Sequence, residues 1–201
     1  MQERMESSKN ENLEFSSKEQ LKNFLILHNI DIKKWGEGNA KNIDHLYKEI
    51  AEHETLLSFE NGIIVRSIQP LRVHVLYNDN GRTFELIEQH QFFIDNGRGR
   101  VRNNPGAIGE KIKFGEPIKQ ALERAITEEL GLTLDPHNEV VALPILKTEP
   151  KESGSYPGIV SIQEIHPYEV FLTSEQFNPS GYVEAQDDKH TCFIWVQKNE
   201  L

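Results

Sequence analysis

In the first sixty residues, hydrophobic positions recur at the three-to-four-residue spacing of a helix. One such stripe covers residues 21–28, and a second covers residues 43–53. Ser16 or Ser17 can cap the first helix and Asn42 the second, because their side-chain oxygens can accept hydrogen bonds from the free N–H groups of a first turn. The pattern therefore predicts two short helices near the start of the chain.

The domain division follows from where this helical spacing begins and ends. Residues 1–15 are polar, carry charges of both signs and show no periodicity, so we expect a disordered tail there. A helical N-terminal module is then predicted over residues 16–60. From residue 62 the spacing changes to that of strands, and we expect residues 61–201 to form a second domain.

The second domain is predicted to be rich in strands. Runs of β-branched and aromatic residues predict strands over residues 63–65, 71–77, 83–94, 140–147, 159–173 and 191–197. A hairpin turn is expected at residues 78–81. Residues 97–115 look like a loop or irregular strand, and residues 174–190 look like a polar loop. The one predicted helix of this domain covers residues 117–130, with a proline at its start and a glycine after its end. One helix among mostly antiparallel strands indicates an α+β or mixed α/β fold.

Composition and charge exclude several classes of protein. The formal net charge of −10 argues against general nucleic-acid binding, which usually depends on a basic surface. A single cysteine, Cys192, rules out an intrachain disulfide framework and a cysteine-rich zinc site. The longest apolar runs are too short to cross a bilayer, and the charged start resembles no secretory signal. We therefore expect a cytoplasmic protein with no membrane association.

Candidate chemistry is concentrated around the helix over residues 117–130. Glu128 and Glu129 are adjacent near its C-terminal end, where the helix dipole disfavours negative charge. A cation held by both would reverse that penalty, and Glu116 in the first turn can reach back over the preceding loop. Oxygen ligands without cysteine favour Mg²⁺ or Mn²⁺ over Zn²⁺.

The stretch GEKIKFGEPIKQALERAITEELGL resembles the Nudix box, G-x5-E-x7-R-E-U-x-E-E-x-G-U, in which U is a bulky aliphatic residue. Alignment on Arg124 over residues 110–132 matches seven of the nine specified positions. The matching residues are Glu116, Arg124, Ile126, Glu128, Glu129, Gly131 and Leu132. The resemblance implies a Nudix-like α/β/α sandwich with a mixed, mainly antiparallel sheet, preceded here by the helical N-terminal module.

Two positions depart from the box. Its first glycine falls on Glu110, although Gly109 stands directly before that residue. The glutamate that follows the arginine in the family, and that usually binds metal there, is Ala125 in this chain. Because positions 125 and 129 share a helix face, the alanine removes one of the converging carboxylates.

The resemblance implies a metal-dependent hydrolase that cleaves the pyrophosphate bond of a nucleoside diphosphate linked to another moiety. It implies Glu116, Glu128 and Glu129 as ligands of Mg²⁺ or Mn²⁺, and assigns the catalytic roles to Arg124, Glu128 and Glu129, with Arg124 orienting the glutamates. The partner is then a small nucleotide diphosphate derivative, and the sequence does not name it.

Further residues are candidates for substrate contact. Arg98, Arg100 and Arg102 alternate, so in an extended strand they would project to one side as a phosphate-facing row. Gly109, beside the box, is the other expected substrate-binding residue. Many family members place an additional acid before a late strand, and Glu184, Asp187 and Asp188 are equal candidates for that role in this sequence.

Two alternatives to an enzyme remain open. Ala125 favours a weak or inactive Nudix-like module that senses a nucleotide without cleaving it. Trp35 lies between the two predicted N-terminal helices, and no helix is predicted after the final strand. These two features favour a protein-interaction scaffold or a homodimer.

Overall fold

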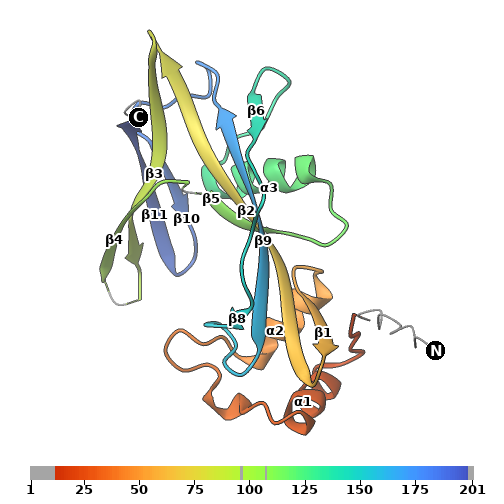
Figure 1. Ribbon diagram of the computed structural model, residues 1–201. Coiled ribbons are helices and arrows are strands. Elements are labelled where there is room, and N and C mark those ends of the chain that lie inside the picture. Colours follow the sequence, from red (N-terminus) through yellow and green to blue (C-terminus); the bar gives the residue numbers. More distant parts are fainter. Residues whose placement is uncertain (1–11, 96, 107, 199–201) are drawn as a thin grey trace, which may run out of the picture. The chain divides into compact units, whose positions relative to one another are not determined.

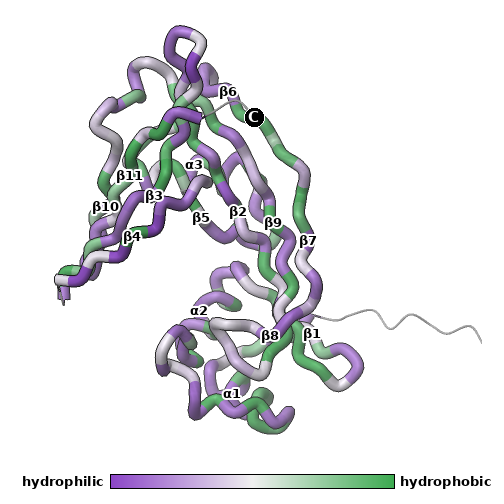
Figure 2. The backbone as a smooth tube through the Cα atoms, turned by 60° about the vertical axis from the view of Figure 1, so that its left-hand side comes forward, coloured by the Kyte–Doolittle hydropathy of each residue, from purple (hydrophilic) through white to green (hydrophobic). Residues whose placement is uncertain are grey.

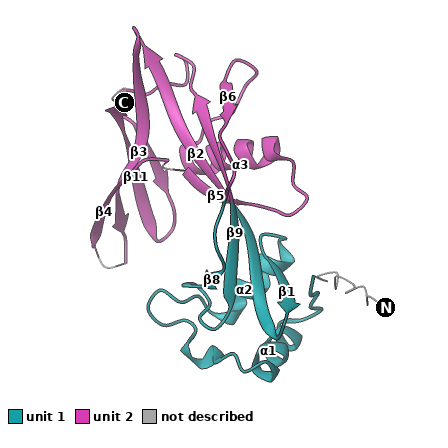
Figure 3. Ribbon diagram, viewed as in Figure 1, with its two compact units in different colours: residues 1–69, 147–164 teal, residues 70–146, 165–201 magenta. Residues whose placement is uncertain are grey.

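The computed structural model describes residues 12–95, 97–106 and 108–198 (Figure 1). The chain divides into two compact units, Met1–Gln69 with Lys147–Glu164 and Pro70–Leu146 with Ile165–Leu201 (Figure 3). The first unit thus includes segments from both sides of the boundary expected at residue 61. Helices and strands occur together, which confirms the mixed α+β class. Within the described ranges, no helix combines the length and the apolar character needed to span a membrane.

The first unit contains the two helices that the hydrophobic spacing predicted. Helix α1 covers Lys18–Leu27, and the Ser17 side chain accepts a hydrogen bond from the Gln20 N–H at its start. Helix α2 covers Ile43–Ala51, and Asn42 accepts from the His45 N–H in the same way. A short 3-10 helix, η1, covers Ile32–Lys34 between them. Both predicted caps are confirmed, with Ser17 rather than Ser16 in the first.

Short strands complete the first unit. Strand β1, Leu56–Glu60, pairs antiparallel with the beginning of β2, Ile63–Asp79. Strand β8, Lys151–Glu152, pairs antiparallel with the beginning of β9, Val160–Phe171. Helices and strands share a core of Leu21, Leu25, Trp35, Leu46, Leu57, Ile64, Tyr156 and Ile159.

Residues 12–15 belong to the first unit, although the sequence pattern included them in a disordered tail. Of the tail expected over residues 1–15, residues 1–11 lie outside the described residues. The Leu13 N–H donates to the Leu57 carbonyl at 2.7 Å and Asn12 forms a β-bridge with Ser58, so these residues pair with β1. Trp35 is buried, and its indole N–H donates to the Pro157 carbonyl at 3.0 Å. This tryptophan therefore packs in the core and does not present a surface to a partner.

The second unit contains most of a large sheet in the order β10–β11–β3–β2–β9–β6. The pairs β10–β11, β11–β3, β2–β3, β3–β4 and β6–β9 are antiparallel, as expected. The remaining strands are β3 Arg82–Phe93, β4 Gly99–Asn104, β5 Ile108–Ile112, β6 Glu139–Ala142, β7 Leu146–Lys147, β10 Tyr182–Ala185 and β11 Lys189–Gln197.

Several strands differ from the predicted pattern. Strand β2 is continuous through Pro70, where the sequence suggested a break. Strand β10 lies inside the segment predicted as a polar loop over residues 174–190, because four of its residues pair with β11. The hairpin between β2 and β3 is confirmed: Asn80 and Gly81 have φ values of 49° and 77°, as the tight turn requires.

Helix α3, Ile118–Leu130, is the only helix described in the second unit, and it packs against β5 (Figure 1). Its apolar stripe, Ala121, Leu122, Ala125 and Ile126, is buried in the core of this unit. Gly131 ends the helix with φ 67°, the left-handed conformation that glycine adopts at low cost. Figure 2 shows hydrophobic and hydrophilic residues interspersed along the strands, as expected for sheets that are buried on one face.

Candidate functional site

A pocket of about 550 Å³ opens in the second unit. We call it the β3–β11 pocket, because these two neighbouring strands supply several of its residues. It is lined by Arg72, Glu88, Gln91, Arg102, Asn104, Pro105, Gly106, Gly109, Glu129, Glu184, Lys189, Thr191 and Phe193. Charged and amide side chains dominate this lining, so the pocket suits a polar, charged ligand.

Two carboxylates from different elements meet in this pocket. Glu129 comes from the last turn of α3 and Glu184 from β10. Burial and, next, the charge of Glu184 raise the pKa of Glu129 from 4.5 to about 7, while Lys189 acts in the opposite direction. Two acids held this close disfavour each other's charge, and a bound cation would relieve that cost.

Arg124 connects the loop before α3 to the helix. Its guanidinium donates to the Lys111 carbonyl at 2.9 Å and to Glu116 at 3.1 and 3.3 Å. Oxygens of Glu110 and Glu128 lie 3.5 and 4.0 Å from another of its nitrogens. Arg124 does not line the β3–β11 pocket. Through these contacts Arg124 fixes residues 110 and 111, which directly follow the lining residue Gly109.

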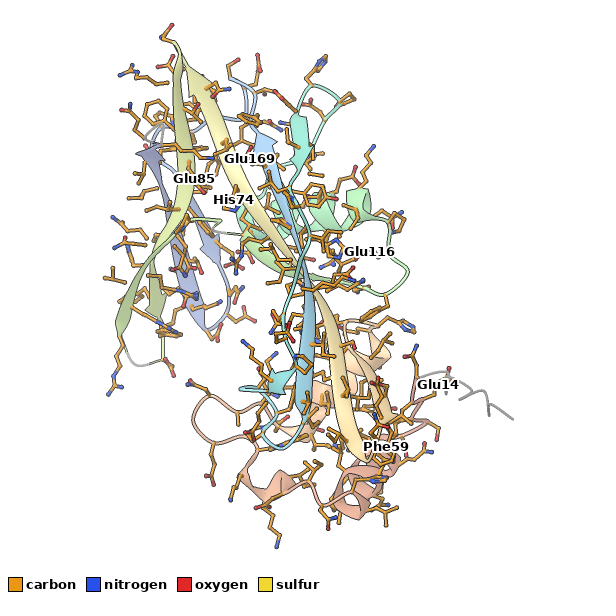
Figure 4. The ribbon with its side chains drawn as sticks, viewed as in Figure 1. Glu14, Phe59, His74, Glu85, Glu116 and Glu169 are labelled. Carbon is orange, nitrogen blue, oxygen red and sulfur yellow. The ribbon has the colours of Figure 1, made fainter. Side chains whose placement is uncertain are left out.

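Both carboxylate oxygens of Glu116 accept hydrogen bonds from within the chain. Burial alone would raise its pKa, but hydrogen bonds from Arg124 and from the Lys113 N–H outweigh burial and hold the pKa below its usual value. Figure 4 places Glu116 by the loop that leads into α3. Its oxygens serve as acceptors for the chain itself, which is a structural use of this carboxylate.

The three expected metal ligands do not gather at one point. Glu129 lines the pocket, Glu116 is bonded to Arg124, and Glu128 has a side chain that is 57% exposed. Adjacent helix residues differ by about 100° in direction, which separates Glu128 from Glu129. Within the residues that the structure describes, no group of three or more His, Cys, Asp or Glu side chains could hold a metal ion.

The three arginines of the expected row differ in their surroundings. Arg102 on β4 lines the pocket, with Nε 3.5 Å from an oxygen of Glu88. Arg98 and Arg100 are exposed and are not among the lining residues. Gly109 lines the pocket, as expected for a substrate-binding residue. Of the predicted substrate contacts, the structure thus brings Arg102 and Gly109 together with Glu129.

Arg72 and Lys189 add positive charge to the lining. Together with Arg102 they balance the three acidic residues Glu88, Glu129 and Glu184. The pocket therefore offers cationic side chains to the anionic oxygens of a ligand, and carboxylates to a metal ion.

Hydrogen bonds between side chains and backbone fix the turn beside the pocket. His74 on β2 and Glu85 on β3 lie side by side, with Nδ1 2.7 Å from a carboxylate oxygen (Figure 4). The same oxygen of Glu85 accepts from the Gly106 N–H at 3.1 Å. The hydrogen bond to His74 lowers the pKa of Glu85, and the Gly106 N–H adds to this effect. At Gly106 φ is 63°, and a Cβ would lie 3.0 Å from the His74 ring, so glycine fits this close approach.

Several lining residues were not among the sequence candidates: Arg72, Glu88, Gln91, Asn104, Lys189 and Thr191. They come from strands β2, β3, β4 and β11, and no local motif marks them. Of the three late acids, Glu184 lines the pocket, whereas Asp187 and Asp188 are exposed and do not. The sequence pattern predicts no strand over residues 174–190, so it gives no means of choosing Glu184 among the three acids.

Comparison with known proteins gives matches among solved structures only. No family model matches the chain, and neither does any curated protein. The chain is similar to the MutT NUDIX hydrolase from Burkholderia pseudomallei, with 16% identity and a TM-score of 0.35 over 67% of this chain and 88% of that one.

Two further solved structures have similar values. The Ap4A hydrolase of C. elegans has 13% identity and a TM-score of 0.33, over 63% of this chain and 80% of that one. The NUDIX domain of Shewanella oneidensis NrtR, complexed with ADP ribose, has 14% identity and a TM-score of 0.32, over 63% and 72%.

Proposed function

We propose that the protein is a metal-dependent hydrolase that cleaves the pyrophosphate bond of a nucleoside diphosphate linked to another moiety. The observation that supports this proposal best is the meeting of Glu129 and Glu184 in a pocket that also presents Arg72, Arg102 and Lys189. Paired carboxylates beside several cationic side chains suit a ligand made of a divalent cation and a diphosphate.

The donor set fits Mg²⁺ or Mn²⁺. Carboxylate oxygens are the ligands that these hard cations prefer, and Mg²⁺ is usually bound by one or two carboxylates together with substrate phosphates and water. Glu129 and Glu184 would hold the cation, so a third acid is not required once a diphosphate is present. When bound, such a cation neutralises charge on phosphoryl oxygens.

The remaining side chains bind and position the substrate. Arg72 and Lys189 attract phosphate oxygens through their charge. Glu129 or Glu184 accepts a proton from the attacking water, whose oxygen forms a bond to phosphorus as the bond to the bridging oxygen breaks and that oxygen leaves on the second phosphate. Arg124 acts one step away from the substrate, because it fixes the loop that carries Gly109. We therefore propose Arg124 as a positioning residue.

The alternative, a nucleotide-sensing module, is supported by Ala125. This side chain is fully buried in the core, so it supplies no carboxylate to the pocket. In a sensor, the pocket would bind the same class of diphosphate without cleaving it. Binding and turnover therefore have to be measured separately.

The experiment is a screen of nucleoside diphosphate derivatives with Mg²⁺ and with Mn²⁺, in which phosphate or nucleotide release is measured. Glu129→Gln and Glu184→Gln should each lower kcat/KM by about a hundredfold or more. The matched control is Asp187→Asn, since Asp187 is an exposed acid near Glu184 that does not line the pocket. This variant should keep the activity of the wild type.

Two results would count against the hydrolase. If the wild type binds a diphosphate derivative but releases no product with either cation, the sensor is favoured. If Asp187→Asn loses as much activity as Glu184→Gln, the pocket is not the site of cleavage.

A further inference from the structure

Strand β4, Gly99–Asn104, lies at an edge of the sheet in the second unit (Figure 1). It pairs antiparallel with β3 on one side, and no other described strand pairs with it. Residues 98–103 are all exposed. We call the outer side of residues 98–101 the free edge. An edge strand with unpaired backbone groups is a template on which another chain can add a strand.

The backbone of β4 presents hydrogen-bonding groups to the free edge. The Phe93 N–H donates to the Arg98 carbonyl at 2.9 Å, so these residues face each other at a hydrogen-bonded position of the β3–β4 ladder. Such positions alternate along an antiparallel pair, which makes Arg100 the next one. Gly99 and Val101 therefore direct their N–H and C=O groups away from β3, where an added strand would pair with them.

The side chains of the free edge differ between the two faces of the strand. Arg98 and Arg100 lie on one face, and neither lines the β3–β11 pocket. Val101 lies on the opposite face and is 73% exposed. On that same face, Phe92 of β3 lies opposite Gly99 and is 45% exposed, and the glycine has no side chain to cover the ring. One face of the free edge is thus cationic and the other is apolar.

This pattern disfavours a second copy of the chain as the added strand. Two β4 strands paired with each other would bring their arginines together, and like charges opposite each other destabilise a strand pair. A strand in which acidic and apolar residues alternate would instead place carboxylates opposite the two arginines. Its apolar side chains would lie opposite Gly99 and Val101, and a large one opposite Gly99 would also cover Phe92.

A nucleic acid would match only part of the free edge. Its phosphates bind guanidinium groups, but they do not pair with a row of backbone N–H and C=O groups or with an exposed valine. At physiological ionic strength exposed charges act over about 8–10 Å. The local arginines, rather than the net charge of −10, therefore govern the approach of an acidic strand.

We propose that the free edge of β4 binds an extended acidic peptide segment of a partner protein by strand addition. The partner's acidic residues lie opposite the two arginines, and its apolar residues lie opposite Gly99 and Val101. Main-chain hydrogen bonds supply affinity, and the alternating side chains supply specificity. Because residues 98–101 do not line the β3–β11 pocket, this interaction does not depend on the proposed hydrolase activity.

The test uses the full-length protein and a fluorescein-labelled, amidated peptide, Glu-Val-Glu-Phe-Glu, with binding measured by fluorescence polarisation. Paired antiparallel with β4, this peptide places its valine opposite Val101 and its phenylalanine opposite Gly99. We expect saturable binding. A peptide with lysine in place of each glutamate should bind about tenfold more weakly, because like charges then face the arginines. The reordered peptide Val-Phe-Glu-Glu-Glu, which keeps the charge but not the alternation, should bind about fivefold more weakly.

Methylation of the peptide nitrogens tests the backbone ladder without changing the protein. A methyl group on the valine nitrogen replaces a hydrogen that donates to β4, so affinity should fall by about tenfold. A methyl group on the nitrogen of the central glutamate is the matched control. That nitrogen points away from β4, so affinity should change by less than about twofold.

A pair of protein variants tests the charge of the free edge. Arg100→Glu should weaken the alternating acidic peptide by about fivefold, because a carboxylate then faces the central glutamate. Arg82→Glu is the control, since Arg82 is 57% exposed and begins β3 at the hairpin with β2, outside the segment that pairs with β4. Both substitutions are at exposed positions, where stability changes little.

Three results would overturn strand addition at β4. The first is equal binding of the alternating acidic peptide and either its lysine or its reordered counterpart. The second is an unchanged affinity when the valine nitrogen is methylated. The third is binding of a single-stranded oligonucleotide that depends on Arg100 while no peptide binds, which would make the free edge a nucleic-acid contact.

Discussion

Glu129 and Glu184 approach each other from α3 and β10 inside one pocket, and the charge of Glu184 helps to raise the pKa of Glu129 to about 7. Two carboxylates in this arrangement carry a cost whenever both are charged and no cation is present. The fold keeps them together although β10 lies 50 or more residues after α3 in the chain. This juxtaposition is the basis of the proposed metal and diphosphate site.

The first prediction concerns the pH dependence of stability without metal. Because the pKa of Glu129 is about 7 in the fold against an ordinary 4.5, the folded state holds a proton between these pH values that the unfolded state has lost. The free energy of unfolding must therefore fall as the pH rises through this window, and stay low above it. Glu129→Gln should be more stable than the wild type above pH 7, by about 1–2 kcal/mol after allowance for solvent screening.

Denaturant titrations in EDTA at pH 4 and at pH 8 measure this difference. At pH 4 the glutamate is protonated in both states, so the variant and the wild type should be equally stable. A stability difference of the same size at both pH values would show that Glu129 is not destabilised by its charge.

A second prediction concerns Arg124. Arg124→Met removes two hydrogen bonds to Glu116 and one to the Lys111 carbonyl, and leaves Glu116 without its cationic partner. The free energy of unfolding should fall by about 2–3 kcal/mol, and kcat should fall as the loop loses its position. Lys119→Met is the control, because Lys119 is 86% exposed and its ion pair with Glu123 at 3.8 Å is worth about 0–1 kcal/mol. Equal losses in both variants would contradict the positioning role.

A third prediction concerns Ala125, where the Nudix box has glutamate. The alanine is fully buried in the core of the second unit, so a glutamate there would bring a charge among apolar side chains. Ala125→Glu should lower the free energy of unfolding by about 2–4 kcal/mol, measured by denaturant titration. Lys119→Glu adds the same side chain at an exposed position of the same helix and should cost far less. A stable Ala125→Glu protein with higher activity would instead mean that the helix can turn this side chain into the pocket.

The fourth prediction concerns Gly181, directly before β10. Its φ is 79°, and a Cβ at this position would overlap the Phe193 carbonyl of the neighbouring strand. Gly181→Ala should therefore displace the start of β10 and with it Glu184, lowering both the melting temperature and the turnover. Gly154→Ala is the control, since nothing lies within 4 Å of the added carbon and this glycine has no positive φ. A Gly181→Ala protein with the melting temperature of the wild type would contradict this account.

Local features of the fold could be predicted from the sequence. Ser17 and Asn42 cap their helices, Gly131 ends α3, and Asn80 and Gly81 form the hairpin turn. Each depends on interactions within a few residues, where side-chain chemistry and backbone preference decide the outcome. The same holds for the buried face of α3, which follows directly from helical spacing.

The pocket could be predicted only in part, because pairing between distant strands creates it. The box resemblance indicated Glu129 and Gly109, both of which line the pocket. Glu88 and Thr191 carry no local signal, since a bulge and the register of β3 against β11 bring them together. The sequence leaves Glu184, Asp187 and Asp188 as equal candidates, and only the pairing of β10 with β11 distinguishes Glu184 from the other two.

The most direct measurement of the central claim is the position of Mn²⁺ in a crystal of the full-length protein soaked with Mn²⁺ and a non-hydrolysable diphosphate analogue. We expect anomalous density between the carboxylates of Glu129 and Glu184, in contact with the diphosphate, and the loss of this density in Glu184→Gln. Mn²⁺ bound elsewhere, for example at the exposed carboxylate of Glu128, with the β3–β11 pocket empty, would contradict the account.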